Sequence, residues 1–143
     1  MALMGVEVGQ KVQIEKTITS EDVRLFAQVT GDTNPLHLDE SYAAGTRFGR
    51  CVVHGMLTAS LISAALGTKV APHSCVIYVG QSLRFLRPVF VGDTVTATAE
   101  VTAIDYEKRL VTLRTECYNQ AGQPVLTGEA TVLLDPAPNP SAS

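Results

Sequence analysis

Tryptophan is absent from this 143-residue sequence, and aromatic residues of all kinds make up only 6% of it. No basic run is interleaved with aromatic side chains, the arrangement on which single-stranded nucleic acid stacks. The formal net charge is −3, so the chain also lacks the positive charge that would attract nucleic acid or an anionic membrane. We therefore expect no nucleic-acid partner.

Cysteine is scarce, and its spacing is not that of a disulfide framework. The three cysteines, Cys51, Cys75 and Cys117, are odd in number, far apart and outside any Cys-x-x-Cys pair. The first residues also lack the basic and long apolar regions of a secretory signal peptide. The sequence thus predicts a reducing compartment, the cytoplasm.

Charge is missing from one long stretch. Residues 51–68 contain no Asp, Glu, Lys or Arg, and their number just reaches the length of a membrane-spanning helix. The stretch holds His54 and several Gly, Ser and Thr residues, too many polar and small side chains for a segment that faces lipid. We therefore expect no membrane span and predict a buried helix from about His54 to Leu66, ended by Gly67.

The residues before this helix predict a strand, a helix and a polar loop. Apolar and polar residues alternate over residues 11–18, the pattern of a half-buried strand. Thr19 or Ser20 is expected to cap a helix that ends at Gly31 in the left-handed conformation. Pro35 disfavours the helical conformation for the residue before it, so a turn is predicted to follow this helix.

The residues after Pro72 predict a run of antiparallel strands separated by Gly, Asp and Asn-rich turns. The expected strands cover residues 75–79, 82–86, 94–104, 110–118 and 125–134. Residues 135–143, rich in Pro and Ser, cannot bury apolar area and are predicted to form a disordered tail. Residues 1–134 are therefore predicted to form a single domain.

The central helix is apolar on every side, so it needs cover on most sides. A curved antiparallel sheet wrapped around this one helix gives that cover. The predicted fold class is therefore α+β, in the hotdog arrangement. The edges of such a sheet remain free to pair, so we expect a homodimer.

Three polar side chains crowd the loop before the central helix: Asp32, Asn34 and His37. Asp and Asn before a Pro form a common turn, and on these residues alone a structural role for Asp32 is favoured. The presence of His37 at this spacing, and of His-Gly-Met-Leu at residues 54–57, reverses that preference. The loop is then interpreted as a source of acid–base chemistry.

The segment Val29–His37 resembles the signature of the hydratase 2, or MaoC-like, family. The resemblance continues through residues 53–57, 78–85 and 87–89 and extends over about residues 8–134, with the Asp…Asn-Pro…His core complete. In length the chain is similar to the (R)-specific enoyl-CoA hydratases of that family. The resemblance implies a hydro-lyase that reversibly adds water in syn fashion to trans-2-enoyl-CoA and forms (R)-3-hydroxyacyl-CoA. It implies no metal and no cofactor, and it makes Asp32 and His37 catalytic.

The residues themselves suit that chemistry. Hydration needs a water activated for attack at C3, a proton delivered to C2 and a stabiliser for the thioester oxygen. Asp32 and His37 can hold the water between them, and the sequence leaves open which of them takes its proton. The backbone N–H of Gly55, at the start of the central helix, is the expected oxyanion donor.

One face of the central helix is predicted to bind the acyl chain. The residues that share this face are Gly55, Ala59, Ile62 and Leu66, with Ser63 alongside. Several basic residues could meet the phosphates of coenzyme A, and each is equally compatible with a solvated surface charge. These residues are Arg47, Arg50, Lys69, Arg84 and Arg87.

Two other functions stay open at this point. An acyl-CoA thioesterase on the same fold would release free coenzyme A, and a non-catalytic acyl-thioester-binding module would bind without turnover. His54 is expected to be a buried histidine with its hydrogen bonds satisfied. The spacing of Asp32, His37 and His54 matches no common metal-ligand pattern.

Overall fold

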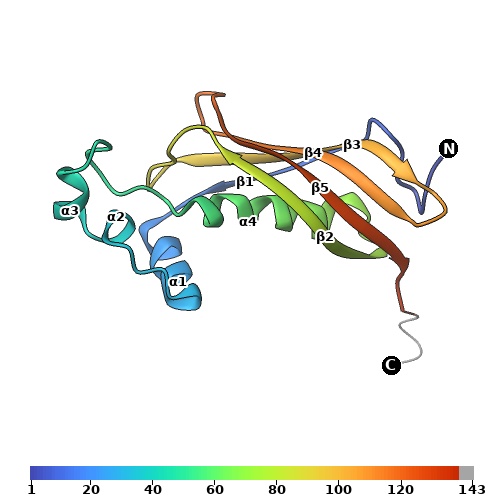
Figure 1. The fold of residues 1–143 in the computed structure, drawn as a ribbon, viewed down its shortest axis with the longest axis horizontal. Helices are drawn as coiled ribbons and strands as arrows, with labels where there is room; N and C mark the ends of the chain where they lie inside the picture. Colours follow the sequence, from blue (N-terminus) through green and yellow to red (C-terminus); the bar gives the residue numbers. More distant parts are fainter. Residues whose placement is uncertain (139–143) are drawn as a thin grey trace.

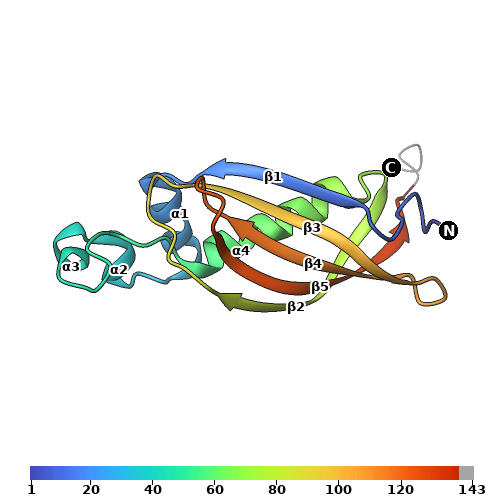
Figure 2. The same ribbon diagram turned by 90° about the horizontal axis from the view of Figure 1, so that it is seen from above.

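The computed structural model describes residues 1–138 and contains one curved antiparallel sheet of five strands, ordered β1-β3-β4-β5-β2. The sheet wraps around helix α4, and helices α1, α2 and α3 lie beyond one end of it (Figures 1 and 2). The strands are β1 (Lys11–Thr17), β2 (Ser74–Phe85), β3 (Thr94–Asp105), β4 (Leu110–Tyr118) and β5 (Pro124–Pro136). The helices are α1 (Ser20–Thr30), α2 (Pro35–Leu38), α3 (Glu40–Ala44), α4 (Gly55–Ala65) and the π-helical η1 (Leu66–Val70). The predicted α+β class with one wrapped central helix is confirmed.

The core lies between α4 and the concave face of the sheet. Ile62 and Leu66 are each 1% exposed, and they belong to the same apolar cluster as the buried side chains of β3, β4 and β5. On β3 the cluster includes the small residues Ala97 and Ala99, which leave room for the helix to approach the strand closely. Full burial of one Ile or Leu side chain contributes roughly 1.5–3 kcal/mol, so this layer holds the helix against the sheet.

Two strands differ from the predicted pattern because each contains a bulge. The pairing of β2 with β5 shifts register between Tyr78 and Gly80, so the two short strands expected there are one bent strand. The pairing of β3 with β4 shifts between Val101 and Ala103. Ala103 is therefore exposed, although regular alternation would place it on the same face as the buried Val101, and Ile104 packs against the core instead.

The last strand is longer than predicted. β5 continues to Pro136, with Asp135 opposite Cys75 on β2, and the Asp135 carboxylate forms a 2.8 Å ion pair with Arg109. The prediction of a disordered tail beginning at residue 135 is therefore wrong for its first two residues, because strand pairing orders them. Residues 139–143 of that tail lie outside the described residues.

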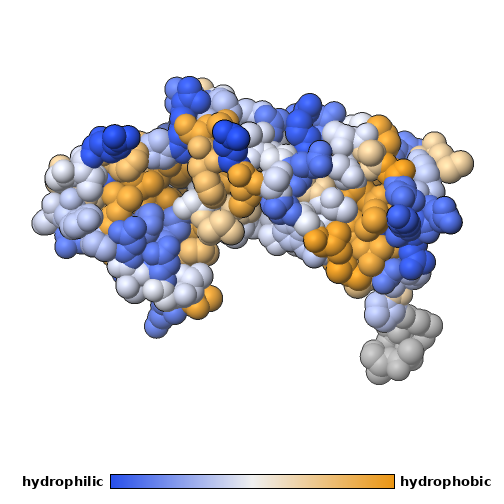
Figure 3. Space-filling view, viewed as in Figure 1, coloured by the Kyte–Doolittle hydropathy of each residue, from blue (hydrophilic) through white to orange (hydrophobic). Residues whose placement is uncertain are grey.

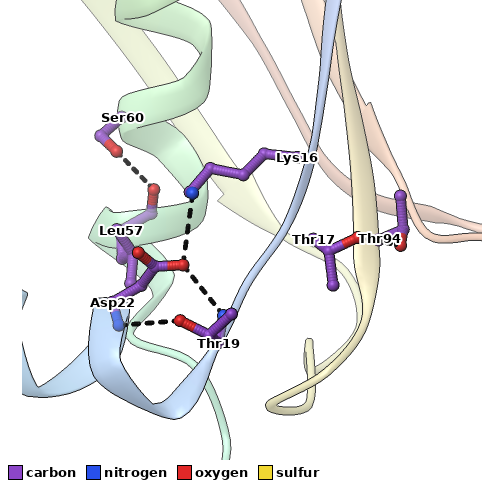
Figure 4. A network of polar contacts seen from close by, with 7 residues as sticks. All are labelled: Lys16, Thr17, Thr19, Asp22, Leu57, Ser60 and Thr94. Atoms are coloured by element: carbon purple, nitrogen blue, oxygen red, sulfur yellow. Dashed lines mark hydrogen bonds and ion pairs between the residues drawn. The ribbon is translucent and has the colours of Figure 1, made fainter.

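Helix α1 begins and ends as the sequence predicts. The Thr19 hydroxyl accepts from the N–H of Asp22 at 3.1 Å, and the Asp22 carboxylate accepts from the N–H of Thr19 at 2.9 Å (Figure 4). Lys16 Nζ lies 3.3 Å from the same carboxylate. The Thr19 N–H, more than Lys16, holds the pKa of Asp22 below its usual value. At the other end Gly31 is left-handed, with φ of +80°.

The segment after Gly31 contains a short helix where only a turn was predicted. Asn34 has the extended conformation that a following proline favours (ψ 124°), and its side chain accepts from the N–H of Leu36 at 3.0 Å. Pro35 is the first residue of α2, where its missing N–H costs no hydrogen bond. The proline thus starts a helix rather than preventing one, and this helix carries His37.

The central helix also passes its expected end. The α-helical turns end at Ala65, and the chain continues as the π-helix η1 through Gly67 to Val70. Gly67 does not have a positive φ and does not end the helix. The side chain of Gln10 donates to the Val70 carbonyl at 3.1 Å and ties this extension to the start of β1. Within residues 1–138 no helix has the length and apolar content to cross a membrane.

Candidate active site

A cavity of about 510 Å³ lies at the N-terminal end of α4, and it brings together Asp32, His37 and Gly55. The apolar part of its wall comes from α2, from the segment between α3 and α4, from the residues at and after the end of β2, and from the start of β5. This apolar set includes Leu36, Phe48, Val52, Val53, Phe85, Leu86, Val89 and Val125. Figure 3 shows apolar side chains gathered on this side of the molecule, between the α2–α3 segment and the end of β2.

The backbone fixes the orientation of His37. Its Nδ1 lies 2.5 Å from the carbonyl oxygen of Val52. A carbonyl oxygen only accepts hydrogen bonds, so the proton of the ring is on Nδ1. In the neutral imidazole Nε2 is then an unprotonated acceptor, as a general base requires.

His54 plays a larger part in the site than the sequence indicated. It is 2% exposed, its ring stacks on that of His37 with centroids 3.9 Å apart, and its Nε2 donates to the carbonyl of Asp32 at 3.0 Å. This contact ties the loop of Asp32 to the start of α4. The expectation that its hydrogen bonds are satisfied is wrong for Nδ1. This atom and the Thr58 hydroxyl are buried without a partner in the described chain, and both residues line the cavity.

The Asp32 carboxylate converges with the two imidazoles. Donor atoms of Asp32, His37 and His54 all lie within 4.8 Å of one another. One oxygen of Asp32 also accepts from the N–H of Asn34 at 3.3 Å, the turn contact expected from the sequence. This spacing admits one water between a carboxylate and an imidazole. The same three residues have the spacing to hold a divalent cation, and the absence of a metal stays a prediction.

The first turn of α4 presents two free backbone donors. The N–H groups of Gly55 and Met56 have no hydrogen-bond partner within residues 1–138, and the His54 side chain does not cap the helix. Free amides at a helix N-terminus attract negative charge because the helix dipole adds to their own polarity. The position suits an oxygen that becomes anionic.

The need for glycine at position 55 has a cause that the sequence did not show. A Cβ built on Gly55 would lie 2.7 Å from the ring of Phe85, closer than real Cβ contacts. A glycine, which has no side chain, could also leave this side of the helix open to a ligand. In the structure the room on that side is taken by Phe85, whose ring also lines the cavity.

The remaining residues predicted to bind the acyl chain do not line this cavity. Ala59, Ile62 and Leu66 are buried in the core, and Ser63 is exposed. Helical spacing shows which residues share a face, but this face packs against the sheet. Their role in acyl binding stays a prediction. The sequence did not show that Phe85, Val89 and Val125 line the cavity, although residues 78–85 and 87–89 belong to the motif that indicated the family.

Comparison with known proteins agrees with this geometry. The MaoC like domain family matches residues 4–120. An (R)-specific enoyl-CoA hydratase of Aeromonas caviae is 49% identical over 134 residues, which cover 94% of this chain and 99% of that protein. An (R)-specific enoyl-CoA hydratase of Rhodospirillum rubrum is 50% identical over 129 residues, covering 90% of this chain and 88% of that one.

Solved structures show the same fold. The (R)-hydratase from A. caviae involved in PHA biosynthesis superposes with a TM-score of 0.86 at 50% identity, over 90% of this chain and 97% of that one. An R-hydratase from Pseudomonas aeruginosa in the unliganded form gives a TM-score of 0.86 at 44% identity, over 93% and 84% of the two chains. In sequence and in its hotdog fold, this chain belongs to the MaoC-like domain family.

Proposed function

We propose that this protein is an (R)-specific enoyl-CoA hydratase, a hydro-lyase that interconverts trans-2-enoyl-CoA and (R)-3-hydroxyacyl-CoA without a cofactor. One observation carries the proposal: a carboxylate, the imidazole of a histidine oriented by a backbone carbonyl and free helix amides converge on one cavity with apolar walls. The hydratase relatives, half identical over nearly the whole chain, support it.

The proposed reaction places the thioester oxygen at the N–H of Gly55 and the water between Asp32 and Nε2 of His37. The water oxygen forms the C3–O bond while one of its O–H bonds breaks. The electron pair of the double bond moves toward C2 and the thioester oxygen, where the helix amides stabilise the charge. The proton then reaches C2 from the same face, so addition is syn. Asp32 and His37 each offer a free acceptor atom to this water.

Substitution of the two polar groups tests this assignment. We expect Asp32→Asn and His37→Gln each to lower kcat for crotonyl-CoA hydration about 10²–10⁴-fold, since each removes an acid–base group without removing bulk. Loss of enoyl absorbance measures the rate, and chiral analysis of the product checks the (R) configuration. Asp105→Asn, the same change at the far end of β3, serves as the control.

The same assay separates the alternatives. Wild-type turnover in either variant would contradict the assignment of the site. Release of free thiol with crotonate as the second product, and no 3-hydroxyacyl-CoA, would identify a thioesterase. Tight acyl-CoA binding with no turnover, unchanged in Asp32→Asn, would identify a binding module.

We further propose that two copies pair along β2. This strand forms one edge of the sheet and exposes Ile77, Val79 and Phe85, whereas β1 at the other edge carries mostly charged and polar residues. Exposed apolar edge strands pair with one another, and charged edges resist pairing. Sedimentation should give twice the chain mass for the wild type and the single-chain mass for Val79→Lys. A monomeric wild type would contradict the pairing.

The cytoplasm is the compartment we propose for the protein. All three cysteines are free, and Cys51 and Cys117 are buried as thiols. Unpaired thiols persist in a reducing compartment. Fractionation of the source cell with a reporter fused to the C-terminus tests this, and recovery in a secreted fraction would contradict it.

A further inference from the structure

A second, more polar cavity adjoins the active-site cavity. It measures about 280 Å³, and the two cavities share Arg87 and Pro88. Arg50 and Phe90 line it from the segment before α4 and the residues after β2, and the turn between β4 and β5 closes it. The two cavities therefore lie side by side, with Gly55 in the first, Arg50 in the second and Arg87 in the wall of both.

Arg50 and Arg87 are the positively charged residues of this second cavity, and contacts with neighbouring groups fix the position of each side chain. Arg87 donates to the Pro124 carbonyl at 3.1 Å, and the Arg50 guanidinium carbon lies 3.9 Å from the centre of the Phe90 ring. Stacking on a ring leaves the N–H edge of a guanidinium free for other acceptors. Within residues 1–138 neither arginine has a carboxylate oxygen within 4.0 Å.

The one acidic residue of the cavity is occupied by its own turn. The Asp93 carboxylate accepts from the N–H of Phe90 at 2.9 Å and from the amide of Gln120 at 3.0 Å. Gln120 in turn accepts from the N–H of Thr94 at 3.0 Å. The Asp93 carboxylate therefore accepts hydrogen bonds from neighbouring loop residues and pairs with neither arginine. The positive charges of Arg50 and Arg87 are not neutralised by an ion pair.

We propose that this second cavity binds the phosphate groups at the far end of the thioester's carrier. The inference rests on the proposed function, because the thioester end of the substrate must lie at Gly55 for the carrier to reach past Arg87. Guanidinium groups bind phosphate oxygens through paired N–H donors. Of the five basic residues that the sequence left undecided, the structure selects Arg50 and Arg87, since Arg47, Lys69 and Arg84 line neither cavity.

The test compares three crotonyl thioesters with the same reacting end. Crotonyl-pantetheine carries no phosphate, crotonyl-4′-phosphopantetheine carries one, and crotonyl-CoA adds the nucleotide phosphates. The variants are Arg50→Gln and Arg87→Gln. Lys108→Gln, which removes one exposed positive charge from the β3–β4 turn at the other end of the sheet, is the matched control.

We expect Arg50→Gln to raise KM for crotonyl-CoA about 10-fold with kcat unchanged, since a hydrogen bond to a charged group is lost. Hydration of crotonyl-pantetheine should stay the same, which also shows that the variant is folded. Added salt should weaken crotonyl-CoA binding in the wild type more than in the variant. Arg87→Gln also alters the wall of the active-site cavity, so it should raise KM for all three thioesters, and for crotonyl-CoA more than for crotonyl-pantetheine.

The three substrates also identify the phosphate. An effect that already appears with crotonyl-4′-phosphopantetheine assigns the site to the phosphate that coenzyme A shares with acyl carrier protein. An effect confined to crotonyl-CoA assigns it to the nucleotide phosphates. Equal losses on all three thioesters, or no loss with crotonyl-CoA, would overturn the inference while leaving the hydratase assignment intact. A wild type that hydrates none of them would overturn the proposed function itself, and this inference with it.

Discussion

The first turn of α4 and the turns that follow it contrast sharply, although they belong to one continuous helix. At Gly55 and Met56 the helix presents free backbone N–H groups to a cavity. From Ala59 to Ala65 its backbone is internally bonded, and the side chains facing the sheet fill the core. The role of the first turn in the site therefore depends on backbone N–H groups and on the absence of a side chain at position 55. The stability that the later turns contribute depends on the volume of their side chains. Substitutions should separate activity from stability along this helix.

The largest effect is expected in the later turns. Ile62→Ala removes a side chain that is 1% exposed, and the cavity left behind should lower the free energy of unfolding by about 2–5 kcal/mol. Urea denaturation measures this loss. The kcat of the folded fraction should stay near the wild-type value, because Ile62 does not line the cavity. A large fall in kcat with normal stability would show that the two parts of the helix are not separable.

A smaller loss of stability is expected in the first turn, together with a loss of activity. In Gly55→Ala the new methyl group must displace the Phe85 ring, and because that ring is half-exposed and free to move, we expect a loss of no more than about 1 kcal/mol. The moved ring should also disturb the cavity and lower kcat for crotonyl-CoA. Adding Phe85→Leu should recover stability in the double variant. If the single variant were fully active and stable, the contact with Phe85 would not be the reason for glycine here.

Thiol labelling measures how well the fold protects the two buried cysteines, Cys51 and Cys117, from a reagent in solution. Burial raises the pKa of Cys117 to about 12, and burial together with Glu40 raises that of Cys51 to about 11. A raised pKa keeps a thiol protonated and unreactive below that pH. At pH 8 we expect an alkylating reagent to modify one cysteine per native chain, the exposed Cys75, and all three after denaturation. Mass spectrometry of the native protein would refute this if Cys117 carried the label.

The smallest effect is expected at Ser63, which lies next to Ile62 but is exposed. Ser63→Ala should change the free energy of unfolding by less than about 0.5 kcal/mol. Its rates with enoyl-CoA thioesters of four to ten carbons test the predicted contact with the acyl chain. A change that grows with chain length would place longer chains along this helix, and a uniform profile would remove Ser63 from the substrate-binding residues.

The parts that could be predicted from the sequence are those fixed by local rules. The Thr19 cap, the left-handed Gly31 and the uncharged central helix that follows His54 depend on neighbouring residues, and each is confirmed. The convergence of Asp32, His37 and Gly55 on one cavity was also predicted, through the resemblance of their motif to a known family.

The parts that could not be predicted depend on distant segments. Phe85 and Val125 reach the cavity only because β2 pairs with β5, and no local pattern carries that register. The bulge between Val101 and Ala103 reverses an alternation that looked regular in the sequence. The selection of Arg50 and Arg87 among five basic residues likewise required knowing which residues line the two adjoining cavities.

The hydrogen bond that orients His37 has a consequence for how this protein can change. The acceptor is the main-chain carbonyl of Val52, whose N–H is itself bonded to the carbonyl of Leu36 at 3.2 Å. Every amino acid supplies that carbonyl, so no substitution at position 52 deletes the contact, while the side chain at that position still shapes the cavity wall. Substitutions at Val52 can therefore change the space for substrate while the His37 ring keeps its orientation. If the acceptor were a side chain, the same substitutions would change the orientation of the ring as well.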